Sequence, residues 1–282
     1  MRLFFLTALT MAAFAANSIL NRLALAGGGI DAISFGTIRL VAGALTLAAL
    51  SLLLRGGLRL GGAGRVVGVT ALVVYIYGFS AAYMALDAGV GALILFAVVQ
   101  ITMFSGALMG REAVPRRRVI GAVLALAGLA WLLWPAGTVR VSVAHGLLMA
   151  AAGVGWGLYS LAGRGRADAL QATAANFVLA APIGVALSLA MMGQGAVLSG
   201  PGVTLAVLSG AVTSGLGYAL WYAVLPRLAA SAAGVAQLSV PVIALAGGIV
   251  LLGEGVSWRM GVASGVVLAG VALSVLPGRR RD

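Results

Sequence analysis

Side chains that could carry out acid–base, nucleophilic or metal chemistry are scarce in this sequence. It contains no Cys, one His and six Asp or Glu among 282 residues. The one His, His145, lies beside Arg140 in a predicted loop, where a solvated side chain is far more common than a catalytic one. An enzyme would need a nucleophile with a base, a pair of carboxylates or a metal cluster. We find none of these patterns, so we expect no enzymatic activity, no metal and no cofactor.

The carboxylates also argue against a buried proton relay. Five of them fall at the ends of long apolar stretches, and the sixth is the terminal Asp282. The five are Asp31, Asp87, Glu112, Asp168 and Glu254. We expect Glu112 and Glu254 to cap the segments that follow them, since carboxylates favour helix N-termini. A proton-driven pump usually needs a titratable group in the transport path, so movement of a solute down its own gradient is the simpler hypothesis, and proton coupling is the alternative.

Aromatic side chains recur at helical spacing in three apolar stretches. Tyr75, Phe79 and Tyr83 follow one another at intervals of four, which places them on one helix face. The other two groups are Trp156 with Tyr159, and Tyr218 with Trp221 and Tyr222. A buried Tyr hydroxyl or Trp NH needs a partner, which water or a ligand in a cavity would supply. We favour a ligand pocket; helix packing, or an interfacial belt for Tyr83 and Tyr222, is the alternative.

Polar side chains also lie deep inside apolar stretches. The candidates for contact with a solute are Asn17, Gln100, Ser160 and Gln237. Each could equally hydrogen-bond a neighbouring helix. Arg39 is the only charge well inside an apolar stretch, and an intramembrane charge suggests a functional site. Its guanidinium could bind a substrate carboxylate through two parallel hydrogen bonds. Alternatively, it could have a structural role and hold its own helix against neighbouring groups.

Ten stretches long enough and apolar enough to cross a bilayer carry these residues. The chain is 62% hydrophobic and 9% charged, whereas a soluble domain is about 25% charged. A helical span needs roughly 20 apolar residues, and the runs here are continuous rather than alternating as in barrel strands. The predicted spans are 3–26, 31–54, 66–87, 89–110, 119–135, 144–163, 169–192, 203–225, 229–252 and 259–277. We therefore predict an all-α integral membrane protein with ten transmembrane helices.

The 18 basic residues, all Arg, divide unequally between the two sides of this predicted bundle. With ten spans both termini share one side, which carries 14 of them. Arg22, Arg140 and Arg259 lie on the other side. Basic loops stay cytoplasmic, so both termini are expected in the cytoplasm. The same bias accounts for the net charge of +12, and we expect no nucleic-acid partner.

The second half of the chain echoes the first at an offset of 142 residues. Glu112 then matches Glu254, and Phe14 falls on Trp156. The two predicted five-span repeats are 1–137 and 142–279. Because each repeat has an odd number of spans, the second repeat begins on the opposite side of the membrane from the first. It is therefore inverted relative to the first. Inverted repeats recur in secondary transporters, whose substrate sites lie near the membrane midplane between the repeats.

Four segments carry a resemblance to a known family. Each repeat ends in a Glu and a Gly-rich span, in GREAVPRRRVIGAVLALAGLAWLL and LGEGVSWRMGVASGVVLAGVALSVL. With Phe14-Ala-Ala-Asn-Ser and Trp156-Gly-Leu-Tyr-Ser, they resemble EamA-type members of the drug/metabolite transporter superfamily, over nearly the whole chain. The aromatic-rich centre is similar to YddG-type exporters of aromatic amino acids, although Phe14 stands where Trp is usual. The resemblance implies that span two is peripheral and often carries a basic residue, which favours a structural role for Arg39.

The residues and the resemblance together predict a secondary transporter of the bacterial inner membrane. We expect it to export amphipathic small metabolites through a central cavity by facilitative alternating access. Aromatic and other apolar amino acids are the favoured substrates, and a nucleoside or drug exporter of the same fold is the alternative. A structural protein that transports nothing is the third possibility. The expected partners are the lipid bilayer and a small-molecule substrate, and we expect a monomer or a weak homodimer.

Overall fold

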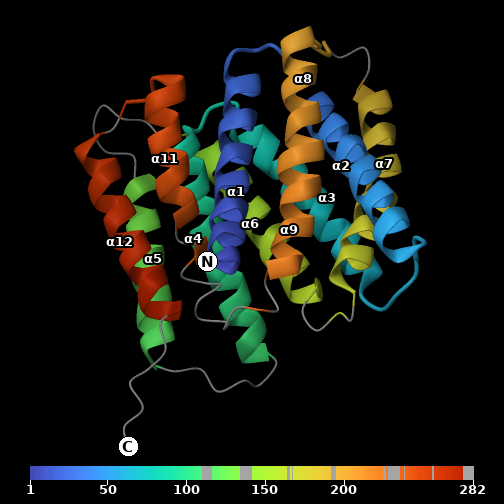
Figure 1. Ribbon diagram of the computed structural model, residues 1–282. Coiled ribbons are helices and arrows are strands. Elements are labelled where there is room, and N and C mark those ends of the chain that lie inside the picture. Colours follow the sequence, from blue (N-terminus) through green and yellow to red (C-terminus); the bar gives the residue numbers. More distant parts are fainter. Residues whose placement is uncertain are drawn as a thin grey trace, which may run out of the picture.

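The structure is an assembly of helices. The computed structural model describes residues 1–109, 116–133, 142–163, 166, 168–191, 195–224, 227, 236–237, 239–255 and 257–275. Within these ranges every regular element is a helix, and strand-like pairing is limited to one isolated bridge between Ile30 and Leu198. Most helices run between the top and the bottom of the view in Figure 1.

The helices follow the chain in a simple order. Their bounds are α1 Arg2–Ala26, α2 Ala32–Arg55, α3 Arg65–Ala82, α4 Ala88–Met109, α5 Arg116–Leu133, α6 Val143–Gly163, α7 Ala169–Met191, α8 Gly200–Leu208, η1 Ser209–Leu216, α9 Gly217–Val224, α11 Ser239–Leu252 and α12 Trp258–Val275. The segments α8, η1 and α9 follow one another without a break and form one rod, in which η1 is wound as a π-helix.

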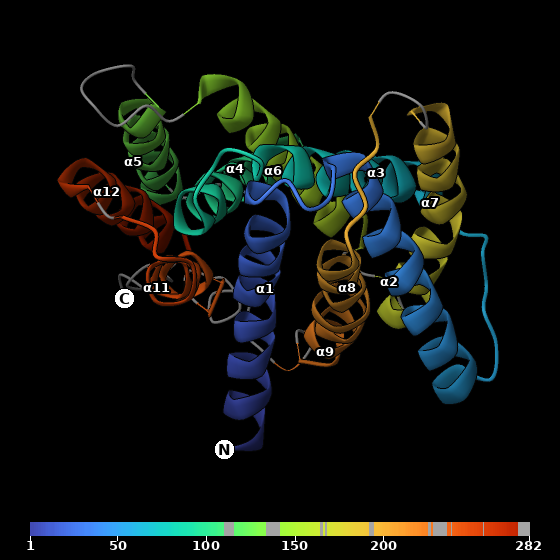
Figure 2. The same ribbon diagram turned by 90° about the horizontal axis from the view of Figure 1, so that it is seen from above.

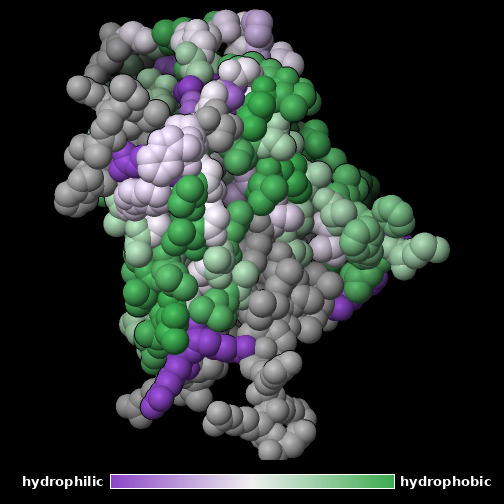
Figure 3. Space-filling view, turned by 90° about the vertical axis from the view of Figure 1, so that its left-hand side faces the viewer, coloured by the Kyte–Doolittle hydropathy of each residue, from purple (hydrophilic) through white to green (hydrophobic). Residues whose placement is uncertain are grey.

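The outer surface is suited to lipid. Seven of the described helices are long and apolar enough to cross a membrane, and α11 and the Val119–Gly128 part of α5 are shorter apolar helices. Large apolar side chains point outward, among them Leu53 at 81% and Val250 at 79% exposed. Large patches of hydrophobic residues lie on the face in Figure 3. Soluble proteins rarely expose so much apolar surface, so the bundle is that of a membrane protein.

Each of the ten predicted spans contains a described helix, but one boundary was wrong. The third span was predicted to reach residue 87, whereas α3 ends at Ala82. The Arg22 guanidinium accounts for this end, because it donates hydrogen bonds to the carbonyls of Tyr83 and Met84. Those carbonyls therefore have a partner outside the helix. Parts of the predicted fifth, ninth and tenth spans lie outside the described residues.

Two short loops meet at the end of the bundle where α1 ends, which we call the Arg22 end. The Asp31 carboxylate caps α2 by accepting from the amides of Ile33 and Ser34. It also accepts from the amide of Val197, in the loop before α8. Burial raises the pKa of Asp31, but these amides together lower it by more, so the pKa lies below its ordinary value. Asp31 is thus ionised and ties two loops that are far apart in sequence.

Packing joins the first half of the chain to the second. Seen from above in Figure 2, α5 lies with α12 at one edge, α2 lies with α7 at the opposite edge, and α1 stands between them. Further inside, α3 packs on α6, α4 on α11, and α1 on the α8–α9 rod. Glycines bring α5 and α12 close: a Cβ on Gly128 would meet Val267, and one on Gly270 would meet Ala125.

Helix α6 is held unusually close to two neighbours. A Cβ on Gly155 would lie 2.7 Å from the Ala71 carbonyl oxygen and 2.9 Å from the Tyr75 amide nitrogen, both in α3. Gly153 and Gly157, which have the small-xxx-small spacing, face Val98 and Thr102 of α4 in the same way. Such contacts let helix backbones approach one another. Helix α6 therefore carries its side chains to the centre of the bundle at a fixed depth.

A methyl group at Gly155 should destabilise the bundle, because both opposing atoms are backbone and cannot rotate away. We expect Gly155→Ala to cost about 1–3 kcal/mol, the usual range for overpacking, seen as a lower thermal midpoint of the detergent-solubilised protein. Gly265→Ala is the matched control, since nothing lies within 4 Å of that position. Equal midpoints for the two variants would contradict the close approach of α6 and α3.

Candidate functional site

A small cavity lies at the centre of the bundle, lined by aromatic and polar side chains. Five of the predicted site residues line it: Asn17, Tyr75, Phe79, Trp156 and Tyr218. They come from α1, α3, α6 and α9. The cavity measures about 20 Å³, which holds about one water, whereas ligand pockets measure about 300–1,000 Å³. As it stands, the cavity is too small for a metabolite.

Trp156 is the hub of the aromatic cluster. Its ring centroid lies 5.0 Å from that of Tyr75 and 4.9 Å from that of Tyr218. It is also stacked on Tyr159 at 5.6 Å. These separations are in the range of favourable aromatic pairs. Both predicted repeats thus contribute rings to one contiguous apolar wall.

Two further predicted residues lie one side chain behind this wall. Trp221 packs edge-on against Phe14, with ring centroids 5.9 Å apart. Tyr83 packs edge-on against Phe79 at 4.7 Å, and its hydroxyl donates to the Ala88 carbonyl. Tyr83 is fully buried, so it does not belong to an interfacial belt.

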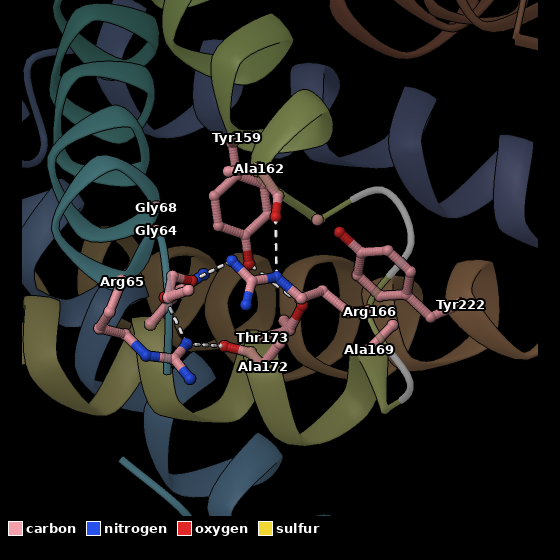
Figure 4. Close-up of a pocket in the computed structure, with 13 residues that line it drawn as sticks. Gly64, Arg65, Gly68, Tyr159, Ala162, Arg166, Ala169, Ala172, Thr173 and Tyr222 are labelled. Atoms are coloured by element: carbon pink, nitrogen blue, oxygen red, sulfur yellow. Dashed lines mark hydrogen bonds between the residues drawn. The ribbon is translucent and has the colours of Figure 1, made fainter. Parts of the chain in front are cut away.

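A second small cavity opens at the opposite end of the bundle, which we call the Arg65 end. Figure 4 shows the Arg65 and Arg166 side chains converging on it, with the Tyr159 and Tyr222 rings on other sides. Arg65 donates to the Ala172 carbonyl and to the Asn176 side chain, and Arg166 donates to the Ala162 and Ala63 carbonyls. Because Tyr159 lines this cavity and stacks on Trp156, one ring pair separates the two cavities.

Three further predicted substrate-binding residues also line neither cavity. The Ser160 hydroxyl donates to the Trp156 carbonyl of its own helix at 2.8 Å. Gln100 is partly buried on α4, and Gln237 is partly buried in the short described segment 236–237. Their contact with a solute stays a prediction.

Arg39 reaches the centre of the bundle. Helix α2 itself lies at an edge, as expected, but the Arg39 side chain extends inward from it to two rings that line the central cavity. The guanidinium is completely buried and lies 5.1 Å from the ring centroids of both Tyr75 and Phe79. Its Nε donates to Ser214 and its Nη2 donates to the Tyr75 hydroxyl, each at 2.9 Å. A long side chain thus carries the charge inward from a peripheral helix.

The sequence reasoning did not select five other residues that line the central cavity. They are Phe14, Ser18, Leu95, Phe96 and Thr213. Phe14 contacts the rings of both Trp156 and Tyr218. A signal for it was present, since the 142-residue offset aligns Phe14 with Trp156. Thr213 gave no such signal, because it lies on η1, whose π-helical winding the sequence analysis did not predict.

Hydroxyl groups of η1 form hydrogen bonds with polar side chains of α1. The Asn17 side-chain oxygen accepts from Ser209 at 2.6 Å and from Thr213 at 2.9 Å. Asn21 donates to Ser209 and accepts from Ser80 of α3. All of these side chains are buried. Asn17 therefore both lines the cavity and joins α1 to η1.

An ion-pair network joins three segments at the Arg22 end. Arg22 bonds Glu254 at 3.1 Å and Asp87 at 3.2 Å. Glu254 also accepts from the amide of Ala88 at the start of α4. The prediction that Glu254 caps the following span was thus wrong: it caps a helix of the other half, because its loop folds over α4. Glu112 lies outside the described residues.

The surroundings of the Glu254 carboxylate disfavour its charged form. Burial raises the pKa of Glu254 above its ordinary value, and the nearby Asp87 carboxylate raises it further. The Ala88 amide and Arg22 lower the pKa, but by less. The Glu254 side chain is only 7% exposed. Breaking such a pair leaves a buried charge without compensation, so this network holds the Arg22 end together.

Comparison with known proteins agrees with this architecture. The EamA-like transporter family matches residues 145–276. The uncharacterized protein PA1977 of Pseudomonas aeruginosa is 46% identical over 283 residues, covering 98% of this chain and 95% of its own. The chain belongs to the EamA-like transporter family.

This EamA-like transporter also shares its fold with a protein of known crystal structure. The two align with a TM-score of 0.69 over 99% of each chain, at 19% identity. At that identity the likeness concerns the fold alone. The family membership makes the chain a membrane transporter.

Removing the Asn17 amide from this EamA-like transporter should destabilise it, because the Ser209 hydroxyl would lose its buried acceptor. We expect Asn17→Ala to cost about 1–3 kcal/mol, measured as reduced resistance to thermal unfolding in detergent. Ser160→Ala is the control, since that hydroxyl bonds only its own helix, and it should change the midpoint little. The network would be unimportant if Asn17→Ala melted like the parent protein.

Proposed function

We propose that this chain exports amphipathic small metabolites across the bacterial inner membrane by facilitative alternating access. Aromatic and other apolar amino acids are the substrates we favour. The observation that carries the proposal is the central cavity, whose lining comes from α1, α3 and α4 of the first half and from α6, η1 and α9 of the second. Substrate sites of inverted-repeat transporters lie at this kind of junction. Stacking on the rings would supply apolar area and orientation.

Reciprocal contacts support the inverted repeat. Gly128 faces Val267, and Gly270 faces Ala125. Residues 125 and 128 become 267 and 270 on adding the offset of 142, so each contact is the repeat image of the other. Contacts that exchange in this way are expected at an interface with two-fold symmetry. The family match to residues 145–276 also falls inside the second proposed repeat, 142–279.

The two ends of the bundle suggest how access alternates. The arginine bias assigns the Arg65 end to the cytoplasm and the Arg22 end to the outside. At the Arg22 end, ion pairs join α1 to the loops before α4 and before α12, and we propose that they close this end. At the Arg65 end, the second cavity is separated from the centre by the Tyr159–Trp156 pair. A solute from the cytoplasm would pass this pair first, and release would need the Arg22 network to part.

Movement down a gradient fits the placement of the carboxylates. All six in the sequence lie at span ends or at the terminus. Proton-coupled carriers usually place a titratable group in the path. We therefore propose facilitation rather than proton-driven export.

Flux in proteoliposomes tests the proposal directly. We expect saturable uptake of labelled phenylalanine and tryptophan, independent of a pH gradient, by the purified protein. Trp156→Ala should reduce this flux at least tenfold, because it removes the hub of the cavity wall. Trp258→Ala is the matched control: this Trp is 75% exposed at the start of α12 and should leave flux within about twofold, as most surface substitutions have small effects.

Other results would redirect the proposal. Uptake of a nucleoside but of neither amino acid would favour the nucleoside exporter. Flux that requires a pH gradient would replace facilitation by proton coupling. Absence of all flux from folded protein would contradict a transport role for the cavity.

Opening at the Arg22 end can be followed by thiol labelling, since the chain has no Cys of its own. We expect Ser18→Cys, in the cavity lining, to react slowly with a membrane-impermeant maleimide added outside. Adding Glu254→Gln should speed the reaction severalfold, because the bonds to Arg22 and Ala88 weaken. Asp168→Asn, which breaks the Arg55 pair at the other end, is the control. If it speeds labelling as much as Glu254→Gln, the Arg22 network is not the outer closure.

A further inference from the structure

Arg39 is a buried cation, and no acid lies beside it among the residues that the structure describes. None of the ion pairs found among the described residues includes it, and its side chain is completely buried. Its two hydrogen bonds go to neutral hydroxyls, those of Ser214 and Tyr75. Buried charges are normally paired with an opposite charge, and intramembrane Arg residues are rare because they are costly. The site therefore holds a positive charge that no carboxylate in the described part of the chain neutralises.

Two polar atoms next to this charge are left without partners. Within the part of the chain that the structure describes, Arg39 Nη1 and the Tyr218 hydroxyl make no hydrogen bond although both are buried. The Tyr218 hydroxyl lies close to the guanidinium, although not in hydrogen-bonding geometry with it, and Tyr218 lines the central cavity. Leaving such groups unpaired costs about 1–3 kcal/mol each, and more for a charged group. An acceptor from outside the protein would relieve both.

The backbone around Arg39 is arranged to hold the guanidinium at this depth. A Cβ on Gly210 of η1 would collide with the Arg39 carbonyl oxygen, so only glycine lets η1 approach α2 this closely. Four residues further along η1, Ser214 binds Nε. The aromatic faces of Tyr75 and Phe79 hold the guanidinium from the cavity side, as cation–π contacts do. Nε is thus held by η1 and Nη2 by α3, while Nη1 has no hydrogen-bond partner among the described residues.

We propose that Arg39 and the hydroxyls of Tyr75 and Tyr218 form an anion subsite of the central cavity, and that the substrates are aromatic or apolar compounds carrying a carboxylate. The inference rests on the proposed function and narrows its substrate class. When the cavity opens, a carboxylate accepts from Nη1 and from the Tyr218 hydroxyl, and the apolar part of the molecule lies along the rings around Trp156. A guanidinium suits this task because it presents several donors in one plane.

The test compares two probes that differ in their charged group. Calorimetric titration of the purified wild-type protein in detergent would use 3-phenylpropanoate, which has only the carboxylate, and phenethylamine, which has only the amine. We expect the carboxylate probe to bind at least tenfold more tightly. Equal affinities, tighter binding of the amine, or no binding of either probe to folded protein would overturn the anion subsite.

Substitutions then assign the selectivity to the two residues. Tyr218→Phe keeps the ring and removes the hydroxyl, so it should weaken 3-phenylpropanoate binding severalfold without weakening any binding of phenethylamine. Arg39→Gln should abolish the preference for the carboxylate, and Arg39→Lys should retain part of it. If Arg39→Gln does not fold, the comparison of the two probes on the wild-type protein and the Tyr218→Phe variant still test the anion subsite. A Tyr218→Phe protein with unchanged binding of 3-phenylpropanoate would remove the hydroxyl from the proposal.

Binding and flux together separate this inference from the proposed function. Selective binding of 3-phenylpropanoate without any flux would support the subsite and contradict transport. Phenylalanine flux inhibited equally by both probes would support transport and overturn the subsite.

Discussion

The charge on Arg39 is the constraint on which the centre of this bundle depends. A guanidinium buried in an apolar environment must be surrounded by groups that can accept its hydrogens or face it with π-electrons. The Ser214 hydroxyl of η1, with the Tyr75 hydroxyl and the Phe79 ring of α3, meets part of that demand and leaves Nη1 without a partner within the described ranges. The positions of α2, α3 and η1 relative to one another are therefore tied to one side chain, and so is the shape of the cavity that they border.

The two ends of the bundle are held by different chemistry. Arg22 pairs with two carboxylates, whereas Arg65 and Arg166 bond mainly backbone carbonyls. Ion pairs weaken with solvent exposure and salt, while bonds to carbonyls depend on the local path of the chain. Opening one end must therefore separate charges, whereas opening the other must shift the backbone of loops.

The sequence predicted most of the helices because continuous apolar runs leave little choice in lipid. The helical spacing of the aromatic residues also predicted that Tyr75, Phe79, Trp156 and Tyr218 line a common pocket. The sequence could not predict what depends on contacts between distant segments. The end of α3 is set by Arg22, and Glu254 caps α4 rather than its own neighbour. The reach of Arg39 into the centre likewise follows from the length of its side chain and from Gly210, not from the position of its helix.

The π-helix at η1 has a consequence for motion. Each turn closed by i→i+5 bonds holds one residue more than an α turn, and one residue corresponds to about 100° of rotation in an α-helix. Rewinding one such turn as α would therefore rotate α9 about its own axis relative to α8. Tyr218 and Trp221, both on α9, would then turn about the axis of the rod, and the Tyr218 hydroxyl would move away from Arg39. A local change of winding in η1 would in this way redirect the two rings that α9 carries.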